Sequence, residues 1–287
     1  MAALALALGS SVLWGIADYL GGFKSRTYPV PVVLALMYLS SLIAMTIFVV
    51  ARGEGPPGTQ SVVAALCAGL VGIAALSAFY RALAIGTMSI VAPIASTGVA
   101  LPVLVGVAGG EHPGLLRSIG IAAAVIGVVL ASRESPTDDA EAVLDPRRQR
   151  QSIYLALVAG VGFGSYFVGA EIASRGDVGW SLLLSRISAA PIVIVIAFMV
   201  VRRGGRFPTA GGLLALLGIG LIDLAANAAY NHATTLGDLS VVSVASSLYP
   251  LTTVILAAVL LGERIRGLRR GGVALALAGV VAIAAGG

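Results

Sequence analysis

A stripe of polar side chains runs along the otherwise apolar segment from Leu213 to Asn231. Asp223, Asn227 and Asn231 follow one another at intervals of four residues. On an α-helix they would therefore share one face, with Tyr230 beside them. An ionised carboxylate at the centre of a bilayer costs about 2.5–3.5 kcal/mol on insertion scales, so such a group is retained where it faces a protein partner or a water-filled path. The stripe predicts a polar cavity inside a membrane protein.

A second charged residue, Arg186, lies in the preceding apolar segment at about the same predicted depth as Asp223. Because consecutive spans run antiparallel, equal depth favours an Arg186–Asp223 ion pair, made directly or through water. Removing one partner would leave a buried charge uncompensated. The pair could simply hold two helices together, or it could form part of a substrate or proton site. The polar stripe that continues from Asp223 favours a site.

Hydroxyl groups gather in the next apolar segment, where Pro250 cannot donate a hydrogen bond to the carbonyl of Ser246. Segment 88–108 repeats this combination of prolines with serine and threonine. Each proline alone is a simple kink, but a pair in corresponding spans of two halves favours a cavity. The resulting candidate substrate-binding residues are Arg186, Asp223, Asn227, Tyr230, Ser243, Ser246, Ser247, Tyr249, Ser96 and Trp14.

Two further carboxylates are candidates for coupling transport to protons. Asp18 shares a helix face with Trp14 in the first apolar segment, and Glu171 lies near the end of segment 152–174. Anchoring at the membrane surface is the alternative role for these side chains. His112 and His232 have no second histidine or cysteine at ligand spacing, so we expect no metal site.

Composition places most of the chain in lipid. Hydrophobic residues make up 58% of its 287 residues and charged residues 11%, whereas soluble domains contain about 25% charged residues. The net charge of +5 comes from arginines in short loops, as in membrane proteins, and does not indicate nucleic-acid binding. Cys67 is the only cysteine, which excludes a disulfide framework. No phosphate-binding G-x-x-x-x-G-K-[ST] loop occurs, so we expect no nucleotide or other cofactor and an energy source in a solute or ion gradient.

The apolar runs predict an all-α integral membrane protein with ten transmembrane helices in two halves. Residues 1–132 and 152–287 form the halves, and the polar stretch 133–151 is the predicted linker. Gly110-Glu111 recurs as Gly262-Glu263, among other collinear matches. Because each half has an odd number of spans, the second copy would enter the membrane from the opposite side, forming an inverted repeat. The predicted spans are 2–22, 31–51, 61–81, 88–108, 114–132, 152–174, 179–201, 211–232, 238–261 and 268–286.

Most arginines fall in loops on one side of this layout, and the positive-inside rule then puts both termini outside the cell.

Several short pieces follow one another along the chain: Leu13-Trp14-Gly15, Tyr80 to Gly86, Val91-Ala92-Pro93-Ile94, Gly110-Glu111, Arg186, Tyr249-Pro250 and Gly262-Glu263-Arg264. Together these pieces resemble the EamA-type members of the drug/metabolite transporter superfamily along the whole chain. The resemblance implies ten helices in two inverted EamA repeats, with efflux or exchange of small metabolites across the plasma membrane. It also implies a cavity lined by helices 3, 4, 8 and 9, with 1 and 6. The first half departs from the pattern, because residues 35–38 stand where the second half has Arg186.

The sequence therefore predicts a multi-pass protein of the plasma membrane that works as a secondary active transporter. We expect an exporter or exchanger of small polar metabolites, such as amino acids or amines, that works by alternating access around a midplane cavity between the repeats. Its expected partners are a small-molecule substrate and the lipid bilayer, without nucleic acid, and the oligomeric state is open. A non-transporting membrane scaffold or receptor, or an intramembrane enzyme, is the alternative. The serines of segment 238–261 have no histidine at a comparable depth, which disfavours an enzyme.

Overall fold

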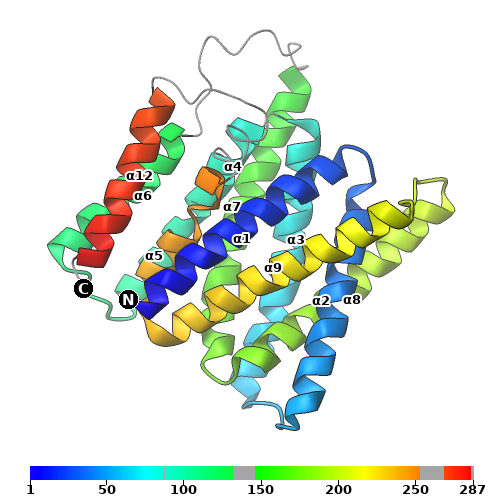
Figure 1. Cartoon of the computed structure of the whole chain (residues 1–287), viewed down its shortest axis with the longest axis horizontal. Helices are drawn as coiled ribbons and strands as arrows, with labels where there is room; N and C mark the ends of the chain where they lie inside the picture. The colour runs from blue at the N-terminus through cyan, green and yellow to red at the C-terminus, as the bar shows by residue number, and fades with distance from the viewer. Residues whose placement is uncertain (87, 132–145, 253–267, 286–287) are drawn as a thin grey trace.

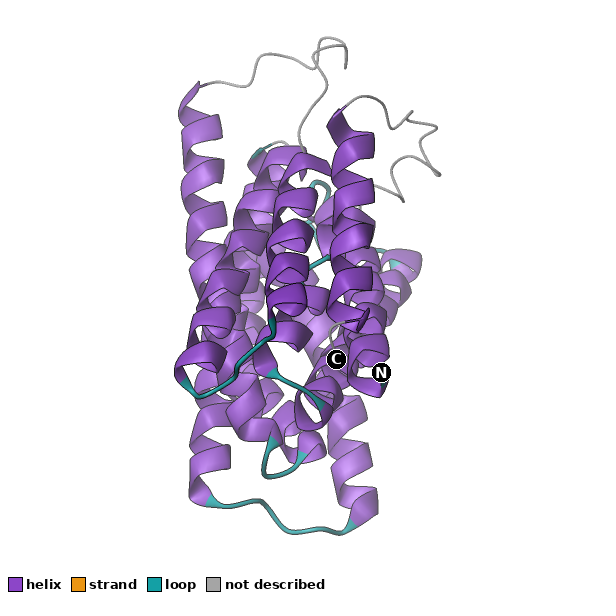
Figure 2. Ribbon diagram, turned by 90° about the vertical axis from the view of Figure 1, so that its left-hand side faces the viewer, coloured by secondary structure: helices purple, strands orange, loops and turns teal. Residues whose placement is uncertain are grey.

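The computed structural model describes residues 1–86, 88–131, 146–252 and 268–285. The described residues form helices joined by turns and loops, without a β-strand (Figure 2). The helices are α1 (Ala2–Ser25), α2 (Val30–Arg52), α3 (Thr59–Ile85), α4 (Met88–Ser96), the 3₁₀-helix η1 (Thr97–Val99), α5 (Ala100–Ala108), α6 (Leu115–Ala131), α7 (Pro146–Ser174), α8 (Val178–Arg202), α9 (Ala210–Leu236), α10 (Leu239–Ser246) and α12 (Leu268–Ala285).

Within the described residues, six helices are long and apolar enough to cross a membrane: α1, α2, α3, α7, α8 and α9. Shorter apolar helical stretches cover Ile94–Ala108, Leu115–Gly127, Leu239–Thr252 and Ala274–Ile283. The helical membrane protein expected from the sequence is therefore present, and a layout of two repeats fits it. Ten complete crossings remain a prediction, because the second part of segment 238–261 lies outside the described residues.

The helix α7 begins earlier than the sequence predicts. It starts at Pro146, so residues 146–151 of the predicted linker form its first turns. Proline is well suited to the first helical position, where its missing N–H has no intrahelical partner to lose. The polar side chains that follow extend the helix beyond its apolar part, and polarity alone cannot distinguish such an extension from a loop. The rest of the predicted linker lies outside the described residues.

Segment 88–108 is broken at its centre into α4, η1 and α5. The break falls at Gly98, between Pro93 and Pro102. A methyl group at Gly98 would collide with the backbone of Gly160 in α7, and one at Gly164 would collide with the carbonyl of Gly98. The close approach of two backbones therefore coincides with the break. In the second half the α-helix also stops at Ser246, a few residues before Pro250, as that proline predicts.

Contacts between the halves follow a reciprocal pattern (Figure 1). Helix α1 packs against α9, and its counterpart α7 packs against α3, the counterpart of α9. The second helices of the halves, α2 and α8, contact each other, as do the last helices, α6 and α12. Two copies related by a pseudo-two-fold axis would produce this pattern. The pattern places α7, α8 and α9 beside α1, α2 and α3 at the centre of the protein.

Small residues bring these central helices into backbone contact. At Gly220 of α9 a methyl group would collide with the carbonyl of Met37 in α2. The hydroxyls of Ser40 and Ser41 in α2 donate to the carbonyls of Leu217 and Gly220, each at 2.9 Å. Helices that touch this closely have little freedom to rotate about their axes. The contact between α2 and α9 therefore sets the direction in which the polar stripe of α9 faces.

Candidate functional site

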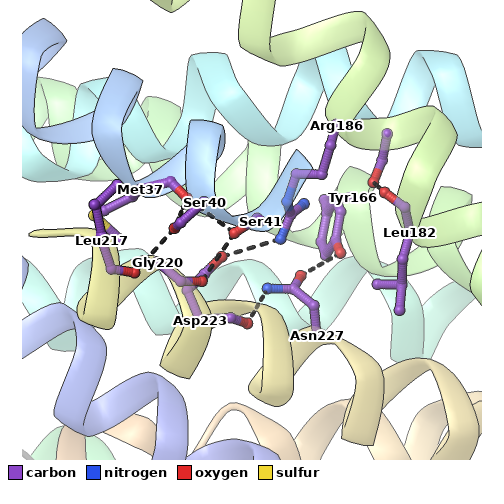
Figure 3. Close-up of polar contacts among 11 residues, drawn as sticks. Met37, Ser40, Ser41, Tyr166, Leu182, Arg186, Leu217, Gly220, Asp223 and Asn227 are labelled. Carbon is purple, nitrogen blue, oxygen red and sulfur yellow. Dashed lines mark hydrogen bonds and ion pairs between the residues drawn. The ribbon is translucent and has the colours of Figure 1, made fainter. Parts of the chain in front are cut away.

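The ion pair predicted between Arg186 and Asp223 is present. Nη2 of Arg186 in α8 donates to Oδ2 of Asp223 in α9 at 3.0 Å, and the exposed fractions of the two side chains are 2% and 12% (Figure 3). The indole of Trp14 in α1 lies beside the Asp223 carboxylate. Opposite charges at this distance in a low-dielectric interior attract strongly, which offsets the cost of removing both from water. Three helices thus meet at one buried carboxylate.

Aromatic hydroxyls and an amide extend this pair into a network. The Tyr166 hydroxyl in α7 donates to Oδ1 of Asn227, and Nδ2 of Asn227 donates to the backbone carbonyl of Asp223 at 2.6 Å (Figure 3). On the other side, the guanidinium of Arg186 lies over the ring of Tyr38, 4.8 Å from its centroid. Such a cation–π contact contributes about 2 kcal/mol or more where the groups are desolvated. The network holds the Arg186 side chain from both halves of the protein.

Three aromatic rings pack together beside the network. Trp14 stacks on Phe167 with centroids 5.5 Å apart, and Phe167 stacks on Tyr230 with centroids 4.7 Å apart. The Tyr230 hydroxyl donates to the carbonyl of Phe167 at 3.1 Å and shares a second hydrogen bond, also of 3.1 Å, with the hydroxyl of Ser243, in which either oxygen can be the donor. Tyr230 is completely buried. Its role in this structure is to connect α7, α9 and α10.

A cavity of about 50 Å³ lies between the halves, against the ion pair. A water molecule needs roughly 10–15 Å³ measured in this way, whereas ligand pockets enclose about 300–1,000 Å³. The cavity thus has room for a few waters and not for a metabolite. Its lining comes from α1, α2, α3, α7, α8, α9 and the residues after α10: Trp14, Asp18, Tyr38, Gly72, Leu76, Phe163, Tyr166, Phe167, Arg186, Asp223, Asn227 and Tyr249.

The structure brings half of the predicted site residues to this cavity: Trp14, Asp18, Arg186, Asp223, Asn227 and Tyr249. Ser246 and Ser247 are buried, but they hydrogen-bond the backbone carbonyls of Ala7 and Val244, at 3.3 and 2.9 Å. Ser96 is buried at the end of α4, next to η1. Tyr230, Ser243 and Ser246 thus belong to contacts between helices, whereas Ser247 bonds its own helix. None of these residues, nor Ser96, is among the described residues that line the cavity.

Glu171 and Asn231 also lie outside the cavity wall. Glu171 accepts a hydrogen bond from Nε of Arg175, one turn along α7, at 2.6 Å, and does not line the cavity. Asn231 donates to the hydroxyl of Ser181 in α8 at 3.3 Å. The face of α9 that carries Asp223 and Asn227 therefore reaches the cavity only along its middle part. Towards its end, the same face becomes a polar contact with α8.

Sequence reasoning did not select Tyr38, Phe163, Tyr166 and Phe167, although all four line the cavity. An aromatic residue in an apolar span has no distinctive spacing, so only its neighbours in space identify it as part of a site. One signal was available for Tyr38, which lies where the first half replaces Arg186. The structure places that tyrosine against Arg186 itself.

A larger hollow of about 630 Å³ lies between α2, α8 and α9, away from the network. Its wall includes exposed apolar side chains such as Phe48 and Leu221, which are 50% and 48% exposed. In a bilayer, surfaces of this kind face acyl chains, so we do not assign the hollow to a solute.

An ion pair at the rim of this hollow joins Asp177, the N-cap of α8, to Arg52, with Nη2 and Oδ2 2.9 Å apart. Partial burial by itself would raise the pKa of the Asp177 carboxyl. The hydrogen bonds from Arg52 and from the N–H of Trp180 outweigh burial, and the pKa lies below its ordinary value.

Glu111, in the loop after α5, connects the halves at the start of α10. Its two carboxylate oxygens accept from the backbone N–H groups of Leu239 and Ser240, at 2.6 and 3.0 Å. The first N–H groups of a helix have no intrahelical partner, and the helix dipole favours a negative charge there. An ion pair between Arg117 and Asp238, 3.1 Å long, lies at the same end. Glu111 thus caps a helix of the other half. The corresponding Glu263 lies outside the described residues.

Comparison with known proteins gives a family and a fold. Two stretches of the chain, residues 1–133 and 150–285, match the family described as the EamA-like transporter family. One similar solved chain, described only as the crystal structure of a protein, is 17% identical and has a TM-score of 0.76. That alignment covers 98% of this chain and 96% of the other, and at such low identity it shows the fold alone. No curated protein matched this sequence.

Proposed function

Since the chain belongs to the EamA-like transporter family, and is thus a membrane protein of transporter type and not an enzyme, we propose that it is a secondary active transporter of small polar metabolites. Amino acids and amines are the proposed substrate classes, moved by export or exchange across the plasma membrane. The observation that carries this proposal is the cavity between the halves, which borders the buried pair of Arg186 and Asp223. A charged pair placed at a cavity, instead of in close-packed protein, is available to a solute.

The proposed mechanism is alternating access. A cavity of about 50 Å³ does not admit a metabolite, so the structure corresponds to a contracted state whose walls must separate to load or release solute. The halves contact each other along α1 with α9 and along α3 with α7, and they would rock about these surfaces. In the proposed site, Arg186 and Asp223 orient charged ends of the solute, and Asn227 supplies a neutral hydrogen bond.

The test is transport by purified protein in sealed proteoliposomes. A thermal-shift screen of amino acids and primary amines first selects the solutes that raise apparent stability, because a ligand of the folded state stabilises it by mass action. Uptake of a selected radiolabelled solute is then compared between wild type, Asp223→Asn and Arg186→Ala. We expect both variants to lose at least tenfold in rate, while Asp238→Asn, in the exposed pair near α10, retains transport. Full transport by folded Asp223→Asn and Arg186→Ala would show that the site is wrong.

A non-transporting scaffold or receptor is the remaining alternative. Such a protein would bind a solute in the thermal-shift screen yet fail to move it across a sealed vesicle.

A further inference from the structure

The charged groups at the cavity do not balance. Among the described residues, three charged side chains border it: Arg186, Asp223 and Asp18. Arg186 is 3.0 Å from Asp223, so these two neutralise each other. None of the ion pairs between described side chains involves Asp18. If all three groups are ionised, the cavity carries one net negative charge.

Within the part of the chain that the structure describes, no cation pairs with Asp18. The groups that interact with its carboxylate are the second carboxylate, Asp223 in α9, the Tyr80 hydroxyl in α3 and the phenol of Tyr249 after α10. The Tyr80 hydroxyl, which lies beside the Asp18 carboxyl, donates to the carbonyl of Ala17 at 3.4 Å. Neutral phenols do not compensate a full charge in a low-dielectric site. Asp18 therefore needs either a proton or a mobile cation.

The rest of the cavity wall is suited to a cation that carries an apolar body. Six of its lining side chains are aromatic: Trp14, Tyr38, Phe163, Tyr166, Phe167 and Tyr249. The faces of aromatic rings attract cations through their quadrupole, and aromatic cages beside a carboxylate suit alkylammonium groups. Trp14 lies one helical turn before Asp18, so an indole and a carboxylate share one face of α1.

A zwitterion or an anion would meet a less favourable site. Its carboxylate would require a free cation, and the described cavity offers only Arg186, which Asp223 and the ring of Tyr38 already engage. Binding such a solute would mean breaking a buried ion pair, whereas binding a monocation at Asp18 leaves that pair intact. The charges around the cavity thus favour monovalent cations over zwitterions and anions.

We propose that the cavity, once its walls separate to load solute, binds monovalent organic cations with an apolar body, and that Asp18 exchanges each bound cation for one proton. When the cation arrives, the carboxyl of Asp18 releases its proton to solvent; when the cation leaves, a proton returns from the opposite side. The net charge in the cavity is the same in both loaded forms, so neither form leaves a bare buried charge. This inference rests on the transport function proposed above. It narrows the substrate class to amines and other organic cations, and it assigns the charge of the solute to Asp18 and not to the Arg186–Asp223 pair.

Binding can be measured with the fluorescence of Trp14. The chain contains two tryptophans, and Trp180 lies outside the cavity, where its indole donates to the carbonyl of Glu54. A Trp180→Phe background therefore leaves one reporter at the site. The probe is benzyltrimethylammonium, whose permanent charge cannot titrate, compared with phenylalanine as zwitterion and 3-phenylpropionate as anion. Each is titrated into purified protein at several pH values.

We expect benzyltrimethylammonium to change Trp14 fluorescence in a saturable way, and phenylalanine and 3-phenylpropionate to bind at least tenfold more weakly. Because proton and cation compete for one carboxylate, the apparent Kd for the probe should rise up to tenfold per unit of pH on acidification. Asp18→Asn should raise Kd at least tenfold and remove the pH dependence. Asp18→Glu should keep that pH dependence, and Asp238→Asn should match the parent protein.

Two results would overturn the inference: tight, pH-dependent probe binding by folded Asp18→Asn, or a preference for phenylalanine over benzyltrimethylammonium. Uptake into sealed vesicles distinguishes a failure of the cation inference from a failure of the proposed transport function. If phenylalanine is transported in an Arg186-dependent way while the probe neither binds nor competes, transport stands and the cation inference is wrong. If no solute of any charge is moved by folded protein, the transport function itself is wrong.

Discussion

The Arg186–Asp223 pair permits a test of how much burial changes the contribution of an ion pair to the free energy of unfolding. Asp223→Asn keeps the shape of the side chain and removes its charge, which leaves Arg186 unpaired in a position where its side chain is 2% exposed. Breaking a buried pair in this way costs about 3–5 kcal/mol. Arg186 keeps its contact with the Tyr38 ring. We therefore expect Asp223→Asn to lower the free energy of unfolding by about 3 kcal/mol, the lower end of this range.

The pair between Arg117 and Asp238 is a matched control. Its length, 3.1 Å, is close to the 3.0 Å of the buried pair, but its side chains are 29% and 46% exposed. Solvent-exposed pairs contribute about 0–1 kcal/mol. Asp238→Asn should therefore change the free energy of unfolding by less than 1 kcal/mol, measured by SDS-induced unfolding in mixed micelles. Equal costs for the two substitutions would refute the reasoning, because they would mean that water screens the buried pair.

Replacing both partners separates a structural role from a functional one. Removing one charge of a buried pair is costly, whereas replacing both by apolar side chains is often neutral or stabilising. We expect Arg186→Met combined with Asp223→Leu to recover most of the stability lost in Asp223→Asn. If the pair only holds α8 against α9, transport should recover together with stability. Under the proposed function, the double variant stays folded and remains inactive in proteoliposomes.

Three further predictions follow from other contacts. Glu111→Gln weakens the cap on α10, because a neutral amide offers one acceptor oxygen instead of two, and should lower the free energy of unfolding by about 1–2 kcal/mol in SDS titration. Gly220→Ala should strongly destabilise the protein in the same assay, since the added methyl meets the backbone of α2, whereas Gly218→Ala, with open space around it, should not. Because the pKa of Asp177 is lowered in the folded protein, its stabilisation is present above the ordinary value of about 3.9 and is lost as pH falls through the lower folded value. An acid titration should therefore show a loss of stability below about pH 4 that is smaller in Asp177→Asn, which keeps an N-cap side chain.

The sequence alone was sufficient to predict the depth of the charged groups and the identity of one pair. Counting residues from the span ends placed Arg186 and Asp223 at one level of adjacent helices, and the structure confirms their ion pair. Helical periodicity likewise placed Trp14 with Asp18, and Asp223 with Asn227, on shared faces that border the cavity. Rise per residue and residues per turn are nearly constant in an α-helix, so such relations within one helix or at equal depth follow directly from the order of residues.

Only the tertiary structure decided which polar faces meet the cavity. Ser243, Ser246 and Tyr230 have the residue types of a binding site, yet they hydrogen-bond neighbouring helices. Tyr166 lies in an apolar run without a motif, yet it contacts Asn227, which is 61 residues away in the chain. The rotation of each helix about its axis, and the choice of its neighbours, depend on close packing between segments distant in sequence. Backbone contacts such as that between Gly220 and Met37 set this rotation, and no periodicity within a single helix encodes it.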